Sequence, residues 1–273
     1  MEPPEQPDAP TWTDLDRPPL RAAALRAALV GPRAWSRLDV VATTGSTNAD
    51  LLADGAAPDG AVLVADHQGA GRGRLGRTWT APARSSLAVS VLLRPAQPLD
   101  RWPLLPLVTG LAVVDTLDAL GVRAGLKWPN DVLVTGPDRP GKVCGILCEA
   151  RADRVVVGAG INVSLRADEL PVETATSIAL AGARARDRDT VLRRYLRALR
   201  RRVDAWAAGE PVLADYRAAS LTLGREVRAQ LPDGTALEGV AVDVEADGRL
   251  VVQPSGGART SLAAADVVHL RPA

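Results

Sequence analysis

Two lysines are the residues whose type and setting most suggest chemistry. The chain has 273 residues, and of its 33 basic residues only Lys127 and Lys142 are not arginine. Arginine can replace lysine on a solvated surface, but not where a compact point charge must fit a tight site. The alternative is that biased codon usage has left these two lysines by chance. The complete absence of phenylalanine fits the same bias. The residues around the two lysines therefore have to decide between a chemical role and chance.

Lys127 opens the segment Lys-Trp-Pro-Asn-Asp, which ends at Asp131. A proline favours an extended conformation at the residue before it. We therefore expect Pro129 to fix a turn and Lys127 to lie at the end of a strand, pointing at a fixed place. Asp131 is a plausible partner for a lysine or for Mg²⁺. The same residues can also form an ordinary turn.

A glycine-rich segment, residues 71–76, matches the G-x-G-x-x-G pattern of dinucleotide sites. Thr-Trp-Thr-Ala-Pro follows instead of a helix, so a pyrophosphate would lack a helix N-terminus, and no Gly-Lys-Ser/Thr of a P-loop follows. Arg72, Arg74 and Arg77 alternate with the glycines, and arginine suits phosphate or carboxylate. The segment predicts an anion-binding loop that becomes ordered when filled. A solvated charged loop is the alternative.

Small polar residues precede this loop. Ser46, Thr47 and Asn48 follow a predicted strand and can cap a short helix. Helix capping alone would explain them, but the same side chains can also meet an amide or urea group of a ligand. Gln68, after the next predicted strand, could do likewise or could be an ordinary polar loop residue.

Composition excludes several classes of protein. The formal net charge is +1, which is unlike the single-sign field of a general nucleic-acid binder. Cys144 and Cys148 lie four residues apart in one predicted strand, too far apart to pair, and no Cys/His cluster has zinc-ligand spacing. No uninterrupted apolar run reaches the roughly 18 residues of a membrane span. We therefore expect a reducing cytoplasm and no membrane.

The hydrophobic pattern predicts an α+β protein. Residues 1–18 are rich in proline and are expected to form a disordered tail. Residues 19–222 are expected to form the main domain, with alternating strands and helices and a strongly amphipathic helix over residues 190–207. Residues 223–273 contain short strands separated by Asp-Gly and Gly-Gly turns, which favours a small separate barrel.

Together these segments resemble the biotin protein ligases, in particular short monofunctional members without an N-terminal DNA-binding domain. The resemblance rests on five motifs in order, at residues 44–48, 68–79, 126–133, 141–147 and 158–163. It implies a mixed-sheet catalytic domain of the biotin/lipoate ligase type and a C-terminal SH3-like β-barrel. It further implies that biotin and MgATP are substrates, that the partner is a biotin carboxyl carrier domain of a carboxylase, and that DNA is not one.

The resemblance also assigns roles. It makes Lys127, Arg72, Lys142 and Asp131 catalytic, with Asp131 a possible contact of the Mg²⁺ that accompanies ATP rather than part of a fixed metal site. The residues implied for biotin are Ser46, Thr47, Asn48, Gln68, Arg72, Gly73, Arg74, Lys127, Gly145 and Ile146. The residues implied for the nucleotide are Arg72, Arg74, Trp79, Asn130, Lys142, Gly160 and Asn162. A lipoate ligase of the same superfamily and a non-catalytic anion-binding module are the alternatives.

Overall fold

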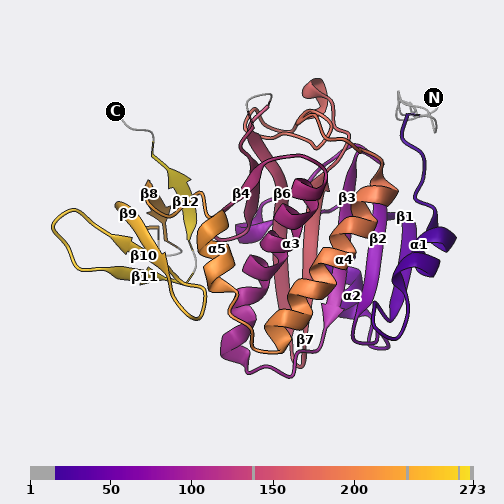
Figure 1. Ribbon diagram of the computed structural model, residues 1–273, viewed down its shortest axis with the longest axis horizontal. Coiled ribbons are helices and arrows are strands. Elements are labelled where there is room, and N and C mark those ends of the chain that lie inside the picture. Colours follow the sequence, from indigo (N-terminus) through magenta and orange to yellow (C-terminus); the bar gives the residue numbers. More distant parts are fainter. Residues whose placement is uncertain (1–15, 137–138, 232–233, 264, 271–273) are drawn as a thin grey trace, which may run out of the picture.

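Two β-sheets and five α-helices make up the computed structural model, which describes residues 16–136, 139–231, 234–263 and 265–270 (Figure 1). In chain order the elements are α1 (Ala22–Leu29), β1 (Arg37–Thr44), α2 (Thr47–Ala53), β2 (Ala61–Gln68), η1 (Arg74–Gly76), β3 (Ser86–Leu93), η2 (Leu99–Leu104), α3 (Leu105–Ala119), β4 (Ala124–Lys127), β5 (Asp131–Val134), β6 (Gly141–Arg151), β7 (Arg154–Asn162), η3 (Ala167–Glu169), α4 (Arg188–Ala207), α5 (Leu213–Ala219), β8 (Glu226–Gln230), β9 (Ala236–Val244), β10 (Leu250–Gln253), β11 (Thr260–Leu262) and β12 (Asp266–His269).

Seven strands form the large sheet, in the order β1-β2-β3-β7-β6-β5-β4. β1 and β2 are parallel, and every other neighbouring pair is antiparallel. The strands predicted from alternating and continuous apolar runs are all present, and the predicted mixed sheet is confirmed. α5, which the sequence analysis did not predict, leads from α4 towards the C-terminal strands.

Helices α3 and α4 cover one face of this sheet (Figure 1). Successive strand residues point to opposite faces, and the residues facing these helices are apolar and fully buried, such as Val89, Val91, Val157 and Ile161. Over residues 190–207 of α4 the apolar residues recur at helical spacing while the arginines lie outward, as the sequence predicted. This face is therefore the main core.

The opposite face has a different composition. Leu63, Leu92 and Val156 pack there against Leu51 of α2 in a second, smaller apolar cluster. Farther along β3 and β7 the residues of the same face are small or polar: Ala88, Ser90, Gly158 and Gly160. Since such residues cannot fill the space above the sheet, this face is free to hold a ligand.

The C-terminal strands form a five-stranded antiparallel sheet, in the order β11-β10-β9-β8-β12. This agrees with the small SH3-like unit expected after residue 222. Its buried residues belong to the same continuous core as those of the large sheet. Trp128 joins the two units, because its indole N–H donates to the Gly248 carbonyl at 3.0 Å.

Two expectations need comment. Residues 1–15 of the predicted tail lie outside the described residues, but Arg17 is 4% exposed and pairs with Glu169, so the ordered chain begins before residue 19. By length and composition, the segment Leu99–Ala119 could cross a membrane. However, 67% of its most apolar 18-residue stretch is buried inside the protein, and core helices pass the same test.

A buried ion pair joins α4 to β2 and generates a stability prediction. Arg188 donates to Asp66 at 2.6 Å, and both side chains are less than a tenth exposed. Asp66→Ala would leave the guanidinium buried without its carboxylate, which costs about 3–5 kcal/mol. Urea unfolding should show a loss of this size.

The matched control is Asp243→Ala. It removes the carboxylate of the Arg217–Asp243 pair, whose side chains are 42% and 49% exposed. Solvent screens such a pair, so its loss should be much smaller. Equal losses in the two variants would contradict the structural role given to Asp66.

Candidate active site

A row of five residues crosses the open face of the large sheet. The strand register pairs Ala88 with Gly160, Gly160 with Gly145, Gly145 with Asp131, and Asp131 with Lys127. Residues paired in this way point to the same face. Three residues with little or no side chain thus form a floor, and a lysine and a carboxylate stand at its end.

A polar network lies beside this floor. Gln68 Oε1 accepts from the Thr47 amide at 2.8 Å, and the Ser90 hydroxyl lies 2.7 Å from Thr47 Oγ1 and 2.6 Å from Asn48 Oδ1. Asn48 rests directly on Gly158, where a Cβ would come within 2.2 Å of Asn48 Oδ1. Ser46 caps α2 through its hydroxyl, so the predicted cap is present. These groups supply hydrogen-bond donors and acceptors at fixed positions.

The glycine-rich segment arches over the floor as a hairpin-like loop. The amide of Trp79 donates to Gly71 O at 2.9 Å, and that of Gly73 donates to Arg77 O at 2.7 Å. A side chain at Gly71 would collide with the Trp79 carbonyl. Only a short 3-10 turn follows the glycines, as expected from the absence of a helix pattern.

The returning strand of this loop places Trp79 against the floor. A Cβ at Gly160 would lie 2.4 Å from the Trp79 ring, so the indole lies flat on β7. The indole N–H is buried and has no hydrogen-bond partner among the described residues. Trp79 therefore offers an aromatic surface to the cavity, while its N–H faces the sheet.

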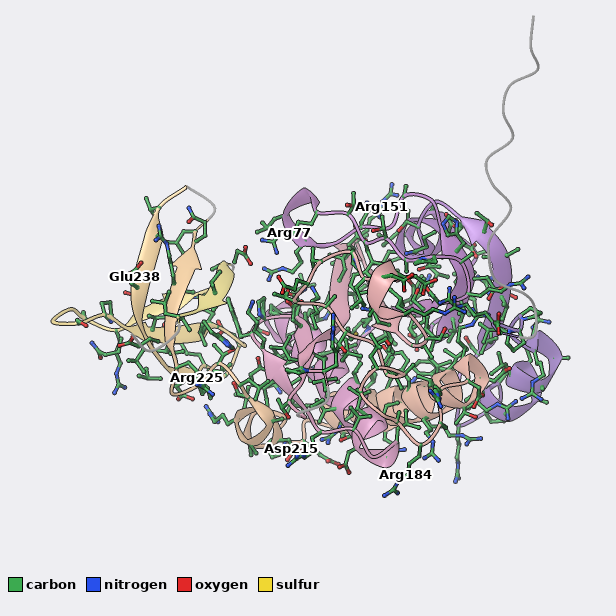
Figure 2. All side chains as sticks on the ribbon, turned by 90° about the horizontal axis from the view of Figure 1, so that it is seen from above. Arg77, Arg151, Arg184, Asp215, Arg225 and Glu238 are labelled. Atoms are coloured by element: carbon green, nitrogen blue, oxygen red, sulfur yellow. The ribbon has the colours of Figure 1, made fainter. Side chains whose placement is uncertain are left out.

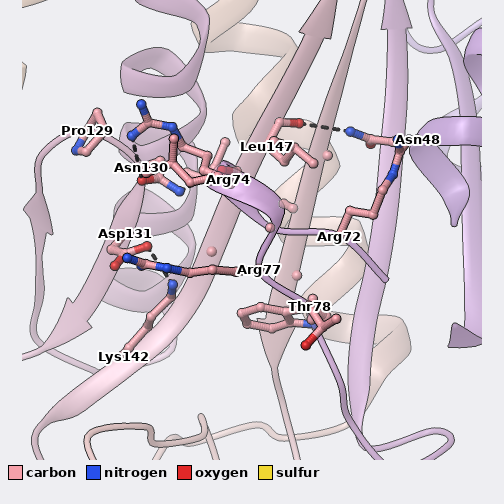
Figure 3. A pocket seen from close by; sticks show the side chains of 18 of the residues that line it. Asn48, Arg72, Arg74, Arg77, Thr78, Pro129, Asn130, Asp131, Lys142 and Leu147 are labelled. Carbon is pink, nitrogen blue, oxygen red and sulfur yellow. Dashed lines mark hydrogen bonds and ion pairs between the residues drawn. The ribbon is translucent and has the colours of Figure 1, made fainter. Parts of the chain in front are cut away.

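Five cationic residues line the same cavity: Arg72, Arg74, Arg77, Lys127 and Lys142. Figure 3 shows all of them except Lys127. Lys142 Nζ lies 2.7 Å from Asp131 Oδ1 and 5.8 Å from the centre of the Trp79 ring. Arg74 donates to Asn130 Oδ1 at 3.4 Å, and burial lowers the pKa of its guanidinium. Lys127 is half-buried at the end of β4. The arrangement concentrates positive charge above an uncharged floor.

Fifteen of the sixteen residues singled out from the sequence line this one cavity. They are Ser46, Thr47, Asn48, Gln68, Arg72, Gly73, Arg74, Trp79, Lys127, Asn130, Asp131, Lys142, Gly145, Ile146 and Gly160.

Asn162 is the exception, and its assignment to the nucleotide site is not supported. Its side chain points to the same face of β7 as Gly160, but the segment around Thr176 covers it. The Asn162 amide donates to Thr176 O at 2.9 Å, and the residue is 2% exposed.

Sequence reasoning missed several lining residues. Ser90 could have been noticed as a polar residue inside an apolar strand, pointing to the side opposite Val89 and Val91. Asp266 of β12 also lines the cavity. It is far away in the sequence and carried no local signal.

The donor set was tested for a metal site. Among the described residues, no group of three or more His, Cys, Asp or Glu side chains could hold a metal ion. Cys144 and Cys148 are free thiols. Burial raises the pKa of the Cys148 thiol to about 12, so it is a poor nucleophile.

Comparison with known proteins identifies the family to which this architecture belongs. Residues 38–165 match the model of the Biotin/lipoate A/B protein ligase family, and residues 222–270 match that of the Biotin protein ligase C terminal domain. The chain is 47% identical over 271 residues to the Biotin--[acetyl-CoA-carboxylase] ligase of Mycobacterium tuberculosis, covering 95% of this chain and all of that protein. The chain belongs to the biotin protein ligase family. The resemblance drawn from the five motifs is thus confirmed.

Two further proteins are similar over most of the chain. The Bifunctional ligase/repressor BirA of Bacillus spizizenii is 35% identical over 230 residues, which cover 80% of this chain and 69% of that protein. The biotin protein ligase of Aquifex aeolicus, solved in complex with biotin and ATP, superposes with a TM-score of 0.73 at 29% identity, covering 87% of this chain and all of that one. The predicted fold is confirmed by this match.

His269 of β12 generates a pH prediction. Its ring lies 3.0 Å from Thr222 Oγ1, and burial and the nearby charges of Lys127 and Arg225 lower its pKa. The unfolded chain then takes up a proton at higher pH than the folded chain. Stability from this group is complete above about pH 6.5 and is lost as the pH falls through the lowered pKa.

The test compares wild type with His269→Asn by urea unfolding at pH 7.5 and pH 5. From pH 7.5 to pH 5 the free energy of unfolding should fall more in the wild type than in the variant, whose side chain cannot be protonated. His67→Asn controls for removal of a histidine elsewhere. Identical pH dependence in wild type and His269→Asn would refute the assignment.

Proposed function

We propose that this biotin protein ligase activates biotin with MgATP to biotinyl-5′-AMP and transfers the biotinyl group to a lysine of a carboxylase carrier domain. The observation that carries the proposal is the transverse row of the large sheet. It sets Lys127 and Asp131 beside a floor of glycine and alanine, between a polar network and an aromatic ring. One cavity therefore offers separate places for a urea ring, a reacting carboxylate and a nucleotide.

The polar network suits the ring of biotin. A cyclic urea has one carbonyl acceptor and two N–H donors. Thr47, Asn48, Gln68 and Ser90 present hydroxyl and amide groups that satisfy both kinds, and the first two are less than 5% exposed. Buried polar groups that lack a partner are costly. The members of the network bond to one another and to Leu147 O and Glu149, so a ligand that enters among them must replace those bonds with its own. A urea group can do so, and the site should therefore select for biotin.

The cations suit the reaction. In the first step a biotin carboxylate oxygen forms a bond to the α-phosphorus of ATP, the bond to the β-phosphate oxygen breaks, and pyrophosphate leaves. Two anions must meet, so fixed positive charge has to offset their repulsion and stabilise the phosphoryl oxygens. We assign this to Lys127 and Arg74, with Lys142 beside Trp79 at the nucleotide.

Mg²⁺ would arrive with ATP. Magnesium is commonly held by one or two carboxylates together with substrate phosphates and water. Asp131 fits such a contact, because it faces the cavity beside Lys142. Its position allows it to orient Lys142 and to approach the ion.

In the second step the neutral amine of the acceptor lysine attacks the carbonyl carbon of the mixed anhydride. The amide bond forms, the bond to phosphate breaks, AMP leaves, and the amine gives up a proton. The name of the Mycobacterium tuberculosis relative supports a carboxylase carrier as acceptor. Two free thiols are consistent with action in a reducing cytoplasm.

Lys127→Ala should lower the rate of biotin-dependent ATP–pyrophosphate exchange by about 10²–10³-fold, the usual cost of removing one group that stabilises developing charge. Lys127→Arg should not restore it, since a forked guanidinium does not replace a compact ammonium. Arg151→Ala, at the exposed end of β6, is the control for loss of a charge on the same sheet. Near-normal exchange in Lys127→Ala would remove the assignment.

The same assay separates the alternatives. The proposal requires exchange with biotin and none when lipoate replaces it. Exchange with lipoate alone would identify a lipoate ligase, and no exchange with either would favour a non-catalytic binding module.

Gly160→Ala tests the place of the nucleotide. The new methyl group would push the Trp79 ring off the floor. Base–aromatic stacking contributes about 1–3 kcal/mol, so the KM for ATP should rise roughly five- to a hundredfold while the Kd for biotin changes little. Gly55→Ala is the control, because a Cβ there meets open space. An unchanged KM for ATP would exclude Trp79 from the nucleotide site.

A further inference from the structure

Apart from Trp79, whose ring packs on Gly160, no side chain of the Gly-Arg loop, residues 71–79, belongs to the apolar core. Its tip, Arg74–Gly76, has no buried residue, and Leu75 is 61% exposed. Hollows lie on both of its sides: the cavity described above, and a second one between the loop, the start of α3 and the Asp247–Arg249 turn. The position of the loop must therefore depend on polar contacts.

Each of the three arginines in the loop reaches an acceptor on a different element. Arg72 pairs with Glu149 of β6 at 3.2 Å, and Arg77 pairs with Asp266 of β12 in the C-terminal sheet. Arg74 has only the neutral amide of Asn130 as its hydrogen-bond acceptor among the described residues. Two of the three arginines are thus matched by a carboxylate and the middle one is not.

This difference gives the three arginines of the loop different roles. Arg72 and Arg77 each contact a carboxylate directly, whereas Arg74 makes no such contact among the described residues and feels Asp131 and Asp266 only through space. Arg74 is also less exposed than Arg72 and Arg77. We propose that Glu149 and Asp266 are positioning residues: they clamp the two ends of the loop over the cavity and leave Arg74 to the anionic intermediate. The C-terminal sheet thereby controls how long biotinyl-5′-AMP is retained. This inference rests on the proposed function.

Glu149 has a second contact that extends its role. The same carboxylate oxygen, Oε2, accepts from Asn48 Nδ2 at 2.8 Å and from Arg72. Asn48 belongs to the network assigned to the biotin ring. Glu149 therefore connects the ring-binding end of the cavity with the loop that closes over it.

The Arg77–Asp266 clamp is open to solvent, with side chains 60% and 34% exposed. Salt screens such a pair. The dissociation of the adenylate from the wild type should therefore become faster with rising ionic strength. In a variant that lacks the Arg77–Asp266 ion pair, the dissociation rate should depend less on ionic strength.

The experiment measures retention directly. The full chain is incubated with radiolabelled biotin and MgATP, unlabelled adenylate is added, and the dissociation of label is followed. Asp266→Asn should accelerate dissociation about two- to fivefold, the scale of an exposed ion pair, and Glu149→Gln roughly tenfold because it lies deeper. Pyrophosphate exchange at saturating substrate should change less, and unfolding midpoints should stay near wild type.

A double-variant cycle distinguishes a clamp from a general structural effect. Arg77→Gln combined with Asp266→Asn should dissociate no faster than either single variant, because both remove one interaction. Glu238→Gln is the control; it breaks the exposed Arg228–Glu238 pair within the C-terminal sheet, well apart from Arg77 (Figure 2). This variant should retain adenylate as the wild type does.

The outcomes are separable. If the wild type shows no biotin-dependent pyrophosphate exchange, the proposed function fails. If the wild type exchanges normally but Asp266→Asn and Glu149→Gln retain adenylate unchanged, the clamp alone fails. Strictly additive effects of Arg77→Gln and Asp266→Asn would also overturn it.

Discussion

The site depends on a stretch of sheet surface that is built from residues with little or no side chain. Pairing across five strands puts Ala88, Gly160, Gly145, Asp131 and Lys127 into one line. The two glycines let the Trp79 ring lie directly against the backbone, and the two charged residues stand at the end of the line. A larger side chain at Gly160 would meet Trp79, and one at Gly158 would meet Asn48. The fold can hold this surface flat because α3 and α4 complete the core on the other face.

The second constraint is electrostatic. A cavity that must accept two anionic substrates needs positive charge that does not move away. Lys127 and Lys142 are placed by strands, whereas the arginines are placed by a loop whose tip, Arg74–Gly76, has no buried residue. The loop is therefore tied to carboxylates on two walls, one of them in the C-terminal sheet. This gives a physical reason for the small sheet to be part of the site rather than an appendage.

Local pattern was enough to predict most of the elements, because runs of alternating or continuous apolar residues located the strands. Most of the candidate site came from the resemblance to the biotin protein ligases that the five motifs carry. Spacing alone could not give the strand register, so it could not show that Ser90 joins Thr47 and Asn48, or that Glu149 reaches Arg72. The sequence also could not show that Asn162 is covered by residues 174–178 and does not line the cavity, because that segment has no signature in the sequence. Asp266 comes close to Arg77 only through the packing of two sheets.

The central claim is that biotin and the nucleotide share one continuous cavity, with the ring at Asn48 and the base at Trp79. Competition calorimetry with a non-hydrolysable analogue of biotinyl-5′-AMP tests it most directly. The account predicts that one equivalent of analogue binds per chain and excludes both biotin and ATP. An analogue-saturated protein that still binds either substrate with its original affinity would contradict it.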